Sequence, residues 1–177
     1  RAWLGGDALA PAWALAETDF TARVELADLP ADSEICVRVR FEGAGAHPAR
    51  SEPVFGRFRT APRRSRALRF LWGGDTAGQG WGIDLGLGGM KTYEAMRRTH
   101  PHFFIHSGDN IYADGPMLPE VKDASGAVIW RNAFLDVVPE KSKVAETLTE
   151  FRRNYLYNRY DANLRAKPIV KISGFRF

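Results

Sequence analysis

Polar and apolar residues alternate along three stretches of the first sixty residues. The alternation predicts strands over residues 20–26, 34–41 and 53–60. The connection between the first two stretches is polar and contains Pro30, so these two strands are expected to be antiparallel neighbours. Three strands joined by polar turns predict one side of a β-sandwich, which the chain enters partway through.

The second of these strands has a clear apolar face. Ile35, Val37 and Val39 alternate with polar or charged residues, so they are expected to point to the same side of the sheet. Cys36 lies in the middle of the strand and is interpreted as a small buried apolar residue.

A short basic stretch follows the predicted strands. Residues 63–67 contain Arg63, Arg64 and Arg66 and have no apolar pattern. The arginines could bind phosphate or nucleic acid, but no aromatic residues alternate with them to stack on bases. A solvated connector between two domains is therefore the favoured interpretation.

After the connector the pattern changes to strand, helix and strand. Apolar runs predict strands over 68–72 and 102–106, and the residues between them predict a helix over 90–99 with Tyr93 and Met96 on its inner side. A strand, a crossover helix and a second strand of this length predict a parallel pair. Farther along, a single apolar stripe predicts a helix of about four turns, formed by Val144, Leu148, Phe151 and Tyr155.

Composition narrows the class of protein. The 177 residues are 45% hydrophobic and 26% charged, which excludes a fibrous or wholly disordered chain. No stretch approaches the ~20 apolar residues of a membrane-spanning helix. The single cysteine excludes an internal disulfide and a cysteine-rich zinc site. The net charge of +4 is mild and favours no particular partner. The chain begins with arginine rather than methionine, so we expect residues to precede it.

Two aspartates follow the two predicted parallel strands. Asp75 comes after Gly73-Gly74, and Asp109 comes after Ser107-Gly108. Ligands bind at the carboxyl ends of parallel strands, so neighbouring strands would bring the two carboxylates together. Their mutual repulsion favours a bound cation, and Tyr112 is close enough in sequence to join them. The alternative is that each aspartate caps a helix or a turn.

Other candidate sites are weaker. The glycine-rich segment before Lys91-Thr92 lacks the glycine that a P-loop needs at position 90, and Ile83 replaces the third glycine of a dinucleotide-binding loop. His106 either supports the loop of Asp109 through a hydrogen bond or is a packed strand histidine.

Three stretches together resemble the alkaline phosphatase D (PhoD-like) group of calcineurin-type metallophosphoesterases. They are residues 69–75, 103–115 and 151–164, and residues 20–62 resemble the N-terminal β-sandwich of that family. The resemblance implies an α/β fold: the βαβ start of an incomplete metallophosphoesterase sandwich with a mixed sheet, preceded by part of a small immunoglobulin- or fibronectin-like domain. The domains would be 1–62, a partial β-sandwich; 63–67, a connector; and 68–177, the N-terminal part of the catalytic domain.

The resemblance also implies a set of metal ligands. Asp109 matches the carboxylate that bridges two metal ions, and Tyr112 matches the tyrosine that binds ferric iron. Asp75 lies where some members have a cysteine ligand, and it keeps an anionic donor there. Iron and calcium are the implied metals, Asn110 is a weaker candidate for contact with phosphate, and no protein side chain is assigned as the attacking group.

The implied function is metal-dependent hydrolysis of a small-molecule phosphoester by a phosphatase or phosphodiesterase. Two metal ions would activate a hydroxide for attack on phosphorus. No histidine follows His106, so we expect the second cluster of ligands to lie outside these residues and the 177 residues alone to be inactive. Export to the periplasm or outside the cell is also implied. The alternative function is a non-catalytic β-sandwich module that binds carbohydrate or protein; no nucleic-acid-binding motif was found.

Overall fold

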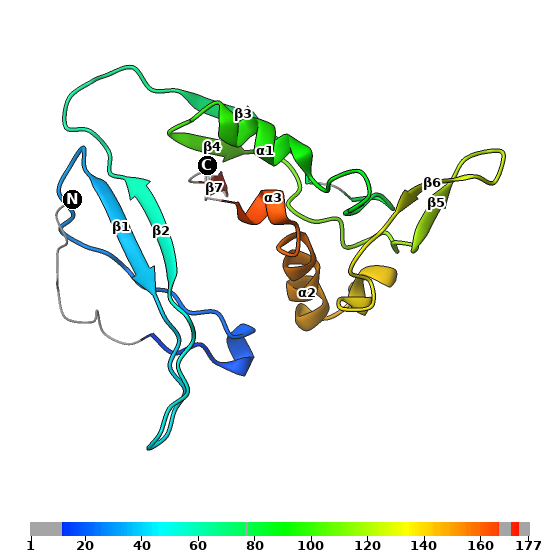
Figure 1. The fold of residues 1–177 in the computed structure, drawn as a ribbon, viewed down its shortest axis with the longest axis horizontal. Helices are drawn as coiled ribbons and strands as arrows, with labels where there is room; N and C mark the ends of the chain where they lie inside the picture. Colours follow the sequence, from blue (N-terminus) through cyan, green and yellow to red (C-terminus); the bar gives the residue numbers. More distant parts are fainter. Residues whose placement is uncertain (1–11, 77, 167–170, 174–177) are drawn as a thin grey trace. The chain divides into compact units, whose positions relative to one another are not determined.

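The computed structural model describes residues 12–76, 78–166 and 171–173. The chain forms two compact units, residues 1–67 and residues 68–177. Most of the tail from Lys167 onward lies outside the described residues. Within the described residues, no helix is long and apolar enough to cross a membrane. The two units are described separately (Figure 1).

The first unit contains a two-stranded antiparallel sheet. Strand β1 (Glu34–Val39) pairs with strand β2 (Val54–Arg59), and Ile35 lies opposite Phe58. Ile35 and Val37 are half-buried, as the alternation predicted, but Val39 is half-exposed and Cys36 is exposed. The prediction of a buried Cys36 is therefore wrong, because in this two-stranded sheet its side chain alternates to the uncovered face.

The strand expected over residues 20–26 does not form. The chain turns instead at a short 3₁₀ helix, η1 (Ala16–Thr18), and Leu15 and Thr21 make only an isolated bridge. Asp19 and Phe20 have φ angles of 52° and 53°, which bend the backbone away from an extended strand. The sandwich therefore remains unconfirmed, because the described residues of this unit contain one sheet and a sandwich needs two.

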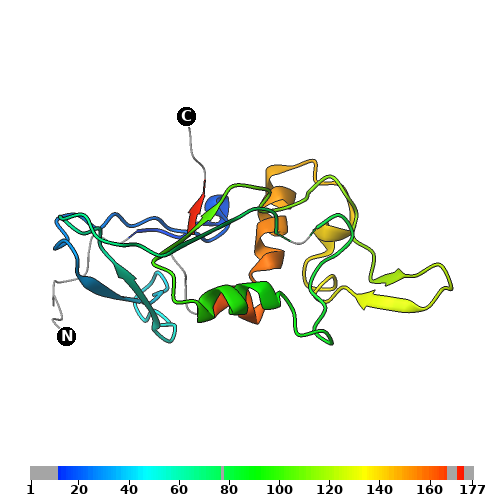
Figure 2. The same ribbon diagram turned by 90° about the horizontal axis from the view of Figure 1, so that it is seen from above.

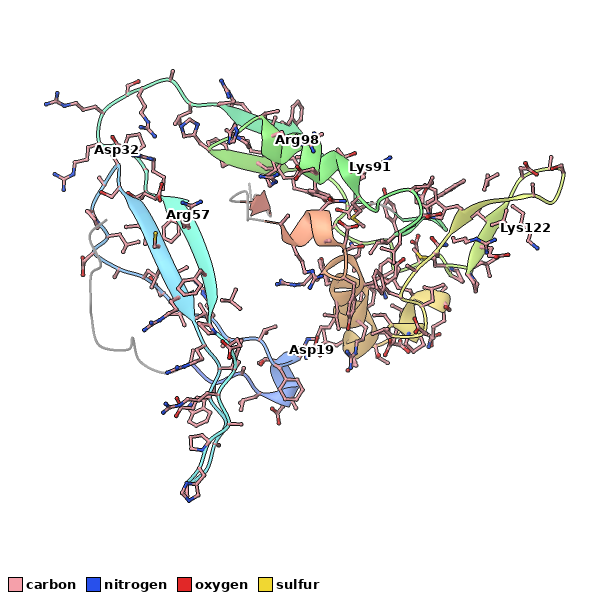
Figure 3. All side chains as sticks on the ribbon, in the orientation of Figure 1. Asp19, Asp32, Arg57, Lys91, Arg98 and Lys122 are labelled. Atoms are coloured by element: carbon pink, nitrogen blue, oxygen red, sulfur yellow. The ribbon has the colours of Figure 1, made fainter. Side chains whose placement is uncertain are left out.

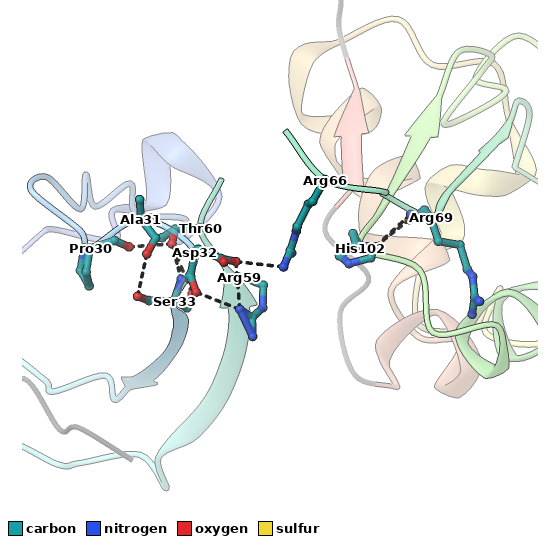
Figure 4. Close-up of polar contacts among 9 residues, drawn as sticks. All are labelled: Pro30, Ala31, Asp32, Ser33, Arg59, Thr60, Arg66, Arg69 and His102. Carbon is teal, nitrogen blue, oxygen red and sulfur yellow. Dashed lines mark hydrogen bonds and ion pairs between the residues drawn. The ribbon is translucent and has the colours of Figure 1, made fainter. Parts of the chain in front are cut away.

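Asp32 joins the start of β1 to the segment after β2. Its carboxylate lies 3.1 Å from the guanidinium of Arg59 and 3.0 Å from that of Arg66 (Figure 4). The hydroxyl of Thr60 donates to the Pro30 carbonyl at 2.6 Å. These contacts close the open end of the β1–β2 pair. The basic stretch of residues 63–67 thus includes one arginine, Arg66, that makes an ion pair within this unit.

The second unit is a small mixed α/β arrangement built on a three-stranded parallel sheet of order β3-β4-β7 (Figures 1 and 2). The predicted parallel pair is confirmed: β3 and β4 are joined by α1, and the Phe70 ring stacks on Phe103 at 5.4 Å across the pair. A hairpin of β5 and β6 was not predicted. The elements are β3 (Phe70–Gly73), α1 (Lys91–Arg98), β4 (Phe103–His106), β5 (Glu120–Lys122), β6 (Val128–Arg131), η2 (Pro139–Ser142), α2 (Leu148–Asn158), α3 (Ala162–Arg165) and β7 (Lys171–Ser173).

Helix α1 has one charged face. Tyr93 and Met96 are partly buried on the other face, as predicted. Lys91 and Arg98 are exposed on this helix, as Lys122 is on β5 (Figure 3).

At the start of β3, His102 accepts a hydrogen bond from the Arg69 amide at 3.0 Å (Figure 4). His102 is thus an exposed strand-end residue rather than part of the candidate site.

The apolar stripe predicted to be the buried face of α2 is exposed, and the opposite face of the helix is buried. Leu148, Phe151 and Tyr155 are exposed, at 65%, 43% and 53%, and Val144 precedes the helix. The buried face is polar and is formed by Asn154, Tyr157 and Asn158. The helix begins later than predicted because Thr147 caps it: its hydroxyl accepts from the Glu150 amide, and Glu150 accepts from the Thr147 amide at 2.9 Å.

The polar face of α2 is buried because the glycine-rich segment next to it has backbone amides that need hydrogen-bond acceptors. The hydroxyl of Tyr157 accepts a hydrogen bond from the Ile83 amide at 3.0 Å. Asp161 accepts from the Met90 amide at 2.9 Å, and Asn132 accepts from the Gly82 amide at 2.8 Å. Buried backbone amides need such partners. A small apolar core surrounds these bonds, formed by Ile83, Met117, Val138 and the Tyr157 ring.

Candidate metal centre

The parallel register of β3 and β4 makes the two strands end together. Gly73 lies opposite His106, and the Ser107 amide donates to the Gly73 carbonyl at 3.0 Å. The loops that carry Asp75 and Asp109 therefore leave the sheet side by side. This is the carboxyl edge at which ligands of parallel sheets bind.

The glycines before the aspartates allow the two loops to touch. A Cβ atom on Gly74 would lie 3.1 Å from the Gly108 Cα, and a Cβ atom on Gly108 would collide with Asp75. A side chain at position 108 would therefore force the loops apart, and one at position 74 would leave little room between them. The glycines thus serve the close approach of two backbones.

Asp75 and Asp109 are joined directly. The Asp75 Oδ1 atom accepts a hydrogen bond from the Asp109 amide at 2.7 Å, and the Asp109 carbonyl accepts one from the Thr76 amide at 2.7 Å. Asp75 has φ of 57°, the left-handed conformation that aspartate tolerates better than most residues. One oxygen of Asp75 therefore fixes the loop of Asp109, a structural role like the turn cap given above as the alternative. The side chains of Asp75 and Asp109 are both exposed.

Tyr112 reaches the same place. Burial raises the pKa of its phenol, and the negative charges of Asp75 and Asp109, together with a hydrogen bond to Asp75, raise it further. Gly78 lies against the Tyr112 ring, where any side chain at position 78 would collide with it. The structure thus brings Asp75, Asp109 and Tyr112 together at the carboxyl edge of the sheet.

Buried polar side chains support the loop that carries Asp75. Thr76 is buried, and its hydroxyl lies 3.0 Å from the Tyr93 hydroxyl and 3.2 Å from His106 Nε2. His106 is thus both a packed strand histidine and a partner of the residue next to Asp75. Asn110 is held through its backbone, because its carbonyl accepts from Asn158 Nδ2 at 2.8 Å.

Sequence reasoning missed Lys141. Its side chain is only 3% exposed, and its Nζ atom donates to the Tyr112 carbonyl at 3.0 Å and to Asn154 Oδ1 at 2.8 Å. Burial lowers its pKa to about 8, against the opposing charge of Asp114. Lys141 lies in a polar stretch of sequence without any distinguishing pattern, so its burial could not be foreseen. In the structure it connects the loop of Tyr112 to α2.

A pocket of about 450 Å³ opens beside these residues. Its polar wall includes Asp109, Tyr112 and Asp114. Its apolar wall includes Ile111, Val144 and Phe151. The volume falls in the range of small-molecule sites, about 300–1,000 Å³.

The donor set suits a hard cation. Among the described residues, no three His, Cys, Asp or Glu side chains lie together as metal ligands. A cation bound at this edge would therefore need a donor of another kind, and the Tyr112 phenol is the one that lies beside Asp75 and Asp109. Two carboxylates and a phenol are all oxygen donors, the kind of ligand that hard cations prefer. Burial first, and then the negative charges of Asp75 and Asp109, raise the pKa of Tyr112, and a cation would offset those charges.

Comparison with known proteins identifies one family. A family model described as PhoD-like phosphatase matches residues 70–170, more than half of the 177 residues. The matched range includes Asp75, Asp109, Tyr112 and Lys141. Searches of curated proteins and of solved structures found no match.

Proposed function

Because the chain belongs to the PhoD-like phosphatase family, we propose that it contributes the first part of a metal-dependent site that hydrolyses small-molecule phosphoesters. Family membership by itself indicates a phosphatase. The metal dependence, the identity of the metals and the roles of individual residues are parts of the proposal.

The observation that carries the proposal is the meeting of Asp75, Asp109 and Tyr112 where β3 and β4 end. These three side chains would hold a cation, with ferric iron beside Tyr112 and calcium as the second metal implied by the family resemblance. When bound, such cations neutralise the charge that develops on the phosphoryl oxygens.

The other residues of the site hold the ligands in place. The hydrogen bond from the Asp109 amide fixes Asp75 relative to Asp109. Gly78 and Lys141 fix Tyr112 from its ring and from its backbone. Ligands held by such contacts lose little further freedom when a cation binds. A carbohydrate- or protein-binding module would leave this arrangement without a role.

The experiment combines a visible spectrum with a phosphatase assay. A tyrosinate bound to ferric iron has a visible charge-transfer band, so the complete protein supplied with iron and calcium should be coloured and should release phosphate. Tyr112→Phe should lose or shift the band, and Asp109→Asn should weaken iron binding.

The control is Asp123→Asn, which changes an aspartate whose Oδ1 accepts hydrogen bonds from Ser125 in the β5–β6 turn. It should alter neither the band nor the activity. An active protein without iron, or a Tyr112→Phe variant with an unchanged band, would contradict the assignment of Tyr112. The 177 residues alone should release little phosphate, and turnover equal to that of the complete protein would show that the expected second cluster is not needed.

A further inference from the structure

Two exposed, large apolar side chains line the pocket of the candidate metal centre. Phe151 and Val144 are 43% and 44% exposed, and both line the same pocket as Asp109 and Tyr112. Exposed apolar side chains that lie singly need no explanation, but apolar side chains grouped in a pocket with polar groups are typical of ligand sites.

The position of Phe151 is fixed by the helix that carries it. The Thr147 cap sets the first turn of α2, and the Phe151 amide donates to the Thr147 carbonyl at 3.0 Å. Ala145 is buried, and its amide donates to the Ala113 carbonyl at 2.8 Å, which holds the neighbouring Val144 next to the loop of Tyr112. The segment of Val144 is therefore attached by a hydrogen bond to the loop that carries Tyr112, whereas Phe151 is positioned by its own helix.

The other residues of the α2 stripe do not share this position. Leu148 and Tyr155 are exposed on the same helix but do not line the pocket. The inner face of α2 is occupied by Asn154 and Tyr157, so Phe151 has no place in the core. Its exposure follows from the polar packing of the helix.

We infer that Phe151 and Val144 bind the organic group of the substrate, so the site prefers phosphoesters whose organic group is aromatic or apolar. This inference rests on the proposed function, since the phosphate would be held by the cations that Asp109 and Tyr112 are proposed to bind. An apolar group against Phe151 and Val144 gains from the burial of nonpolar surface. A polyhydroxylated group would lose hydrogen bonds to water at the same wall.

The experiment compares two esters and two matched variants of the complete protein loaded with iron and calcium. Phe151→Ala removes an aromatic ring from the pocket, and Tyr155→Ala removes one from the same helix outside it. For phenyl phosphate, Phe151→Ala should raise KM by about tenfold with little change in kcat, because the lost contact serves substrate and transition state alike. For glycerol phosphate, KM should change less than about twofold. Tyr155→Ala should leave both unchanged.

Direct binding separates the inference from the proposed function. If neither ester is hydrolysed, the proposed function fails, and calorimetric titration with phenyl phosphate and glycerol phosphate then tests the wall by itself. Tighter binding of phenyl phosphate that Phe151→Ala abolishes would support the inference. Equal binding of the two esters, equal effects of Phe151→Ala on both, or a loss of thermal stability without a change in preference would overturn it. The last result would indicate that another segment of the protein covers Phe151.

Discussion

The carboxylate of Asp75 accepts a hydrogen bond from the backbone amide of Asp109 at 2.7 Å. Two loops that follow different strands are therefore joined at the two residues proposed as ligands. The joint is a hydrogen bond between the two loops themselves, so the fold sets how Asp75 lies relative to Asp109. Its consequences can be tested one contact at a time.

Substitution of Asp75 separates its two roles. Asp75→Asn keeps an oxygen that accepts from the Asp109 amide and tolerates the φ angle of 57°. It should retain the free energy of unfolding and lose at least tenfold in iron affinity. Asp75→Ala should lose iron affinity as well, and its free energy of unfolding should fall by about 1–2 kcal/mol because the hydrogen bond is missing and the backbone is strained. Urea unfolding and iron titration measure the two effects. Equal iron affinity in the Asn variant and the natural protein would exclude Asp75 as a ligand.

A methyl group at Gly78 should displace the Tyr112 ring. Gly78→Ala would overpack this contact and should lower the free energy of unfolding by about 1–3 kcal/mol. It should also shift the visible band of the iron-loaded protein. Gly115→Ala is the control, because a Cβ atom there would meet no described atom within 4 Å. Thermal unfolding and the visible spectrum of both variants decide whether Gly78 supports Tyr112.

Loss of the buried Lys141 amine should loosen the Tyr112 loop. Lys141→Met leaves the Tyr112 carbonyl and the Asn154 side chain without their donor, which should cost about 1–3 kcal/mol. Lys122→Met changes an exposed lysine on β5 and should stay within about 0.5 kcal/mol of the natural protein. Hydrogen exchange should be faster around Tyr112 only in the Lys141 variant. Unchanged exchange there would mean that other contacts hold the loop.

Acid should weaken helix α1 through Glu94. A hydrogen bond from Arg97, and a weaker contribution from a hydrogen bond of Arg98, lower the pKa of Glu94 from 4.5 to about 2. A carboxyl group whose pKa is lower in the folded state than in the unfolded state stabilises the fold at every pH above the unfolded pKa. This contribution is lost as the pH falls from 4.5 through about 2. Glu94→Gln should therefore show a smaller decrease in stability over that range. The check is a urea unfolding series at several pH values. Parallel curves for the two proteins would show that the contacts of Glu94 with the arginines add nothing measurable.

Local pattern was sufficient for the elements that position the candidate ligands. The strand, helix and strand around residues 68–106 were predicted because short apolar runs and a crossover of this length allow few alternatives, and their parallel pairing is confirmed. The meeting of Asp75 and Asp109 follows from that pairing, since both residues come directly after strands that end together.

Local pattern failed where a strand depends on a partner that the pattern does not identify. Residues 20–26 alternate like a strand, but the chain turns at Asp19 and Phe20, and β1 pairs instead with β2. An alternating pattern shows that a segment can be a strand, whereas the hydrogen bonds of a strand depend on a neighbour that the pattern does not identify.

The sequence by itself determined the type and order of β3, α1 and β4 and the two aspartates after the strands, because these depend on neighbouring residues. Only the tertiary structure decided which face of α2 is buried. Its apolar stripe suggested one face, but the amides of the glycine-rich segment need buried acceptors, and Tyr157 supplies one to Ile83 at 3.0 Å. That choice leaves Phe151 exposed beside the candidate metal centre, and it places Asn154 where it accepts a hydrogen bond from the buried Lys141.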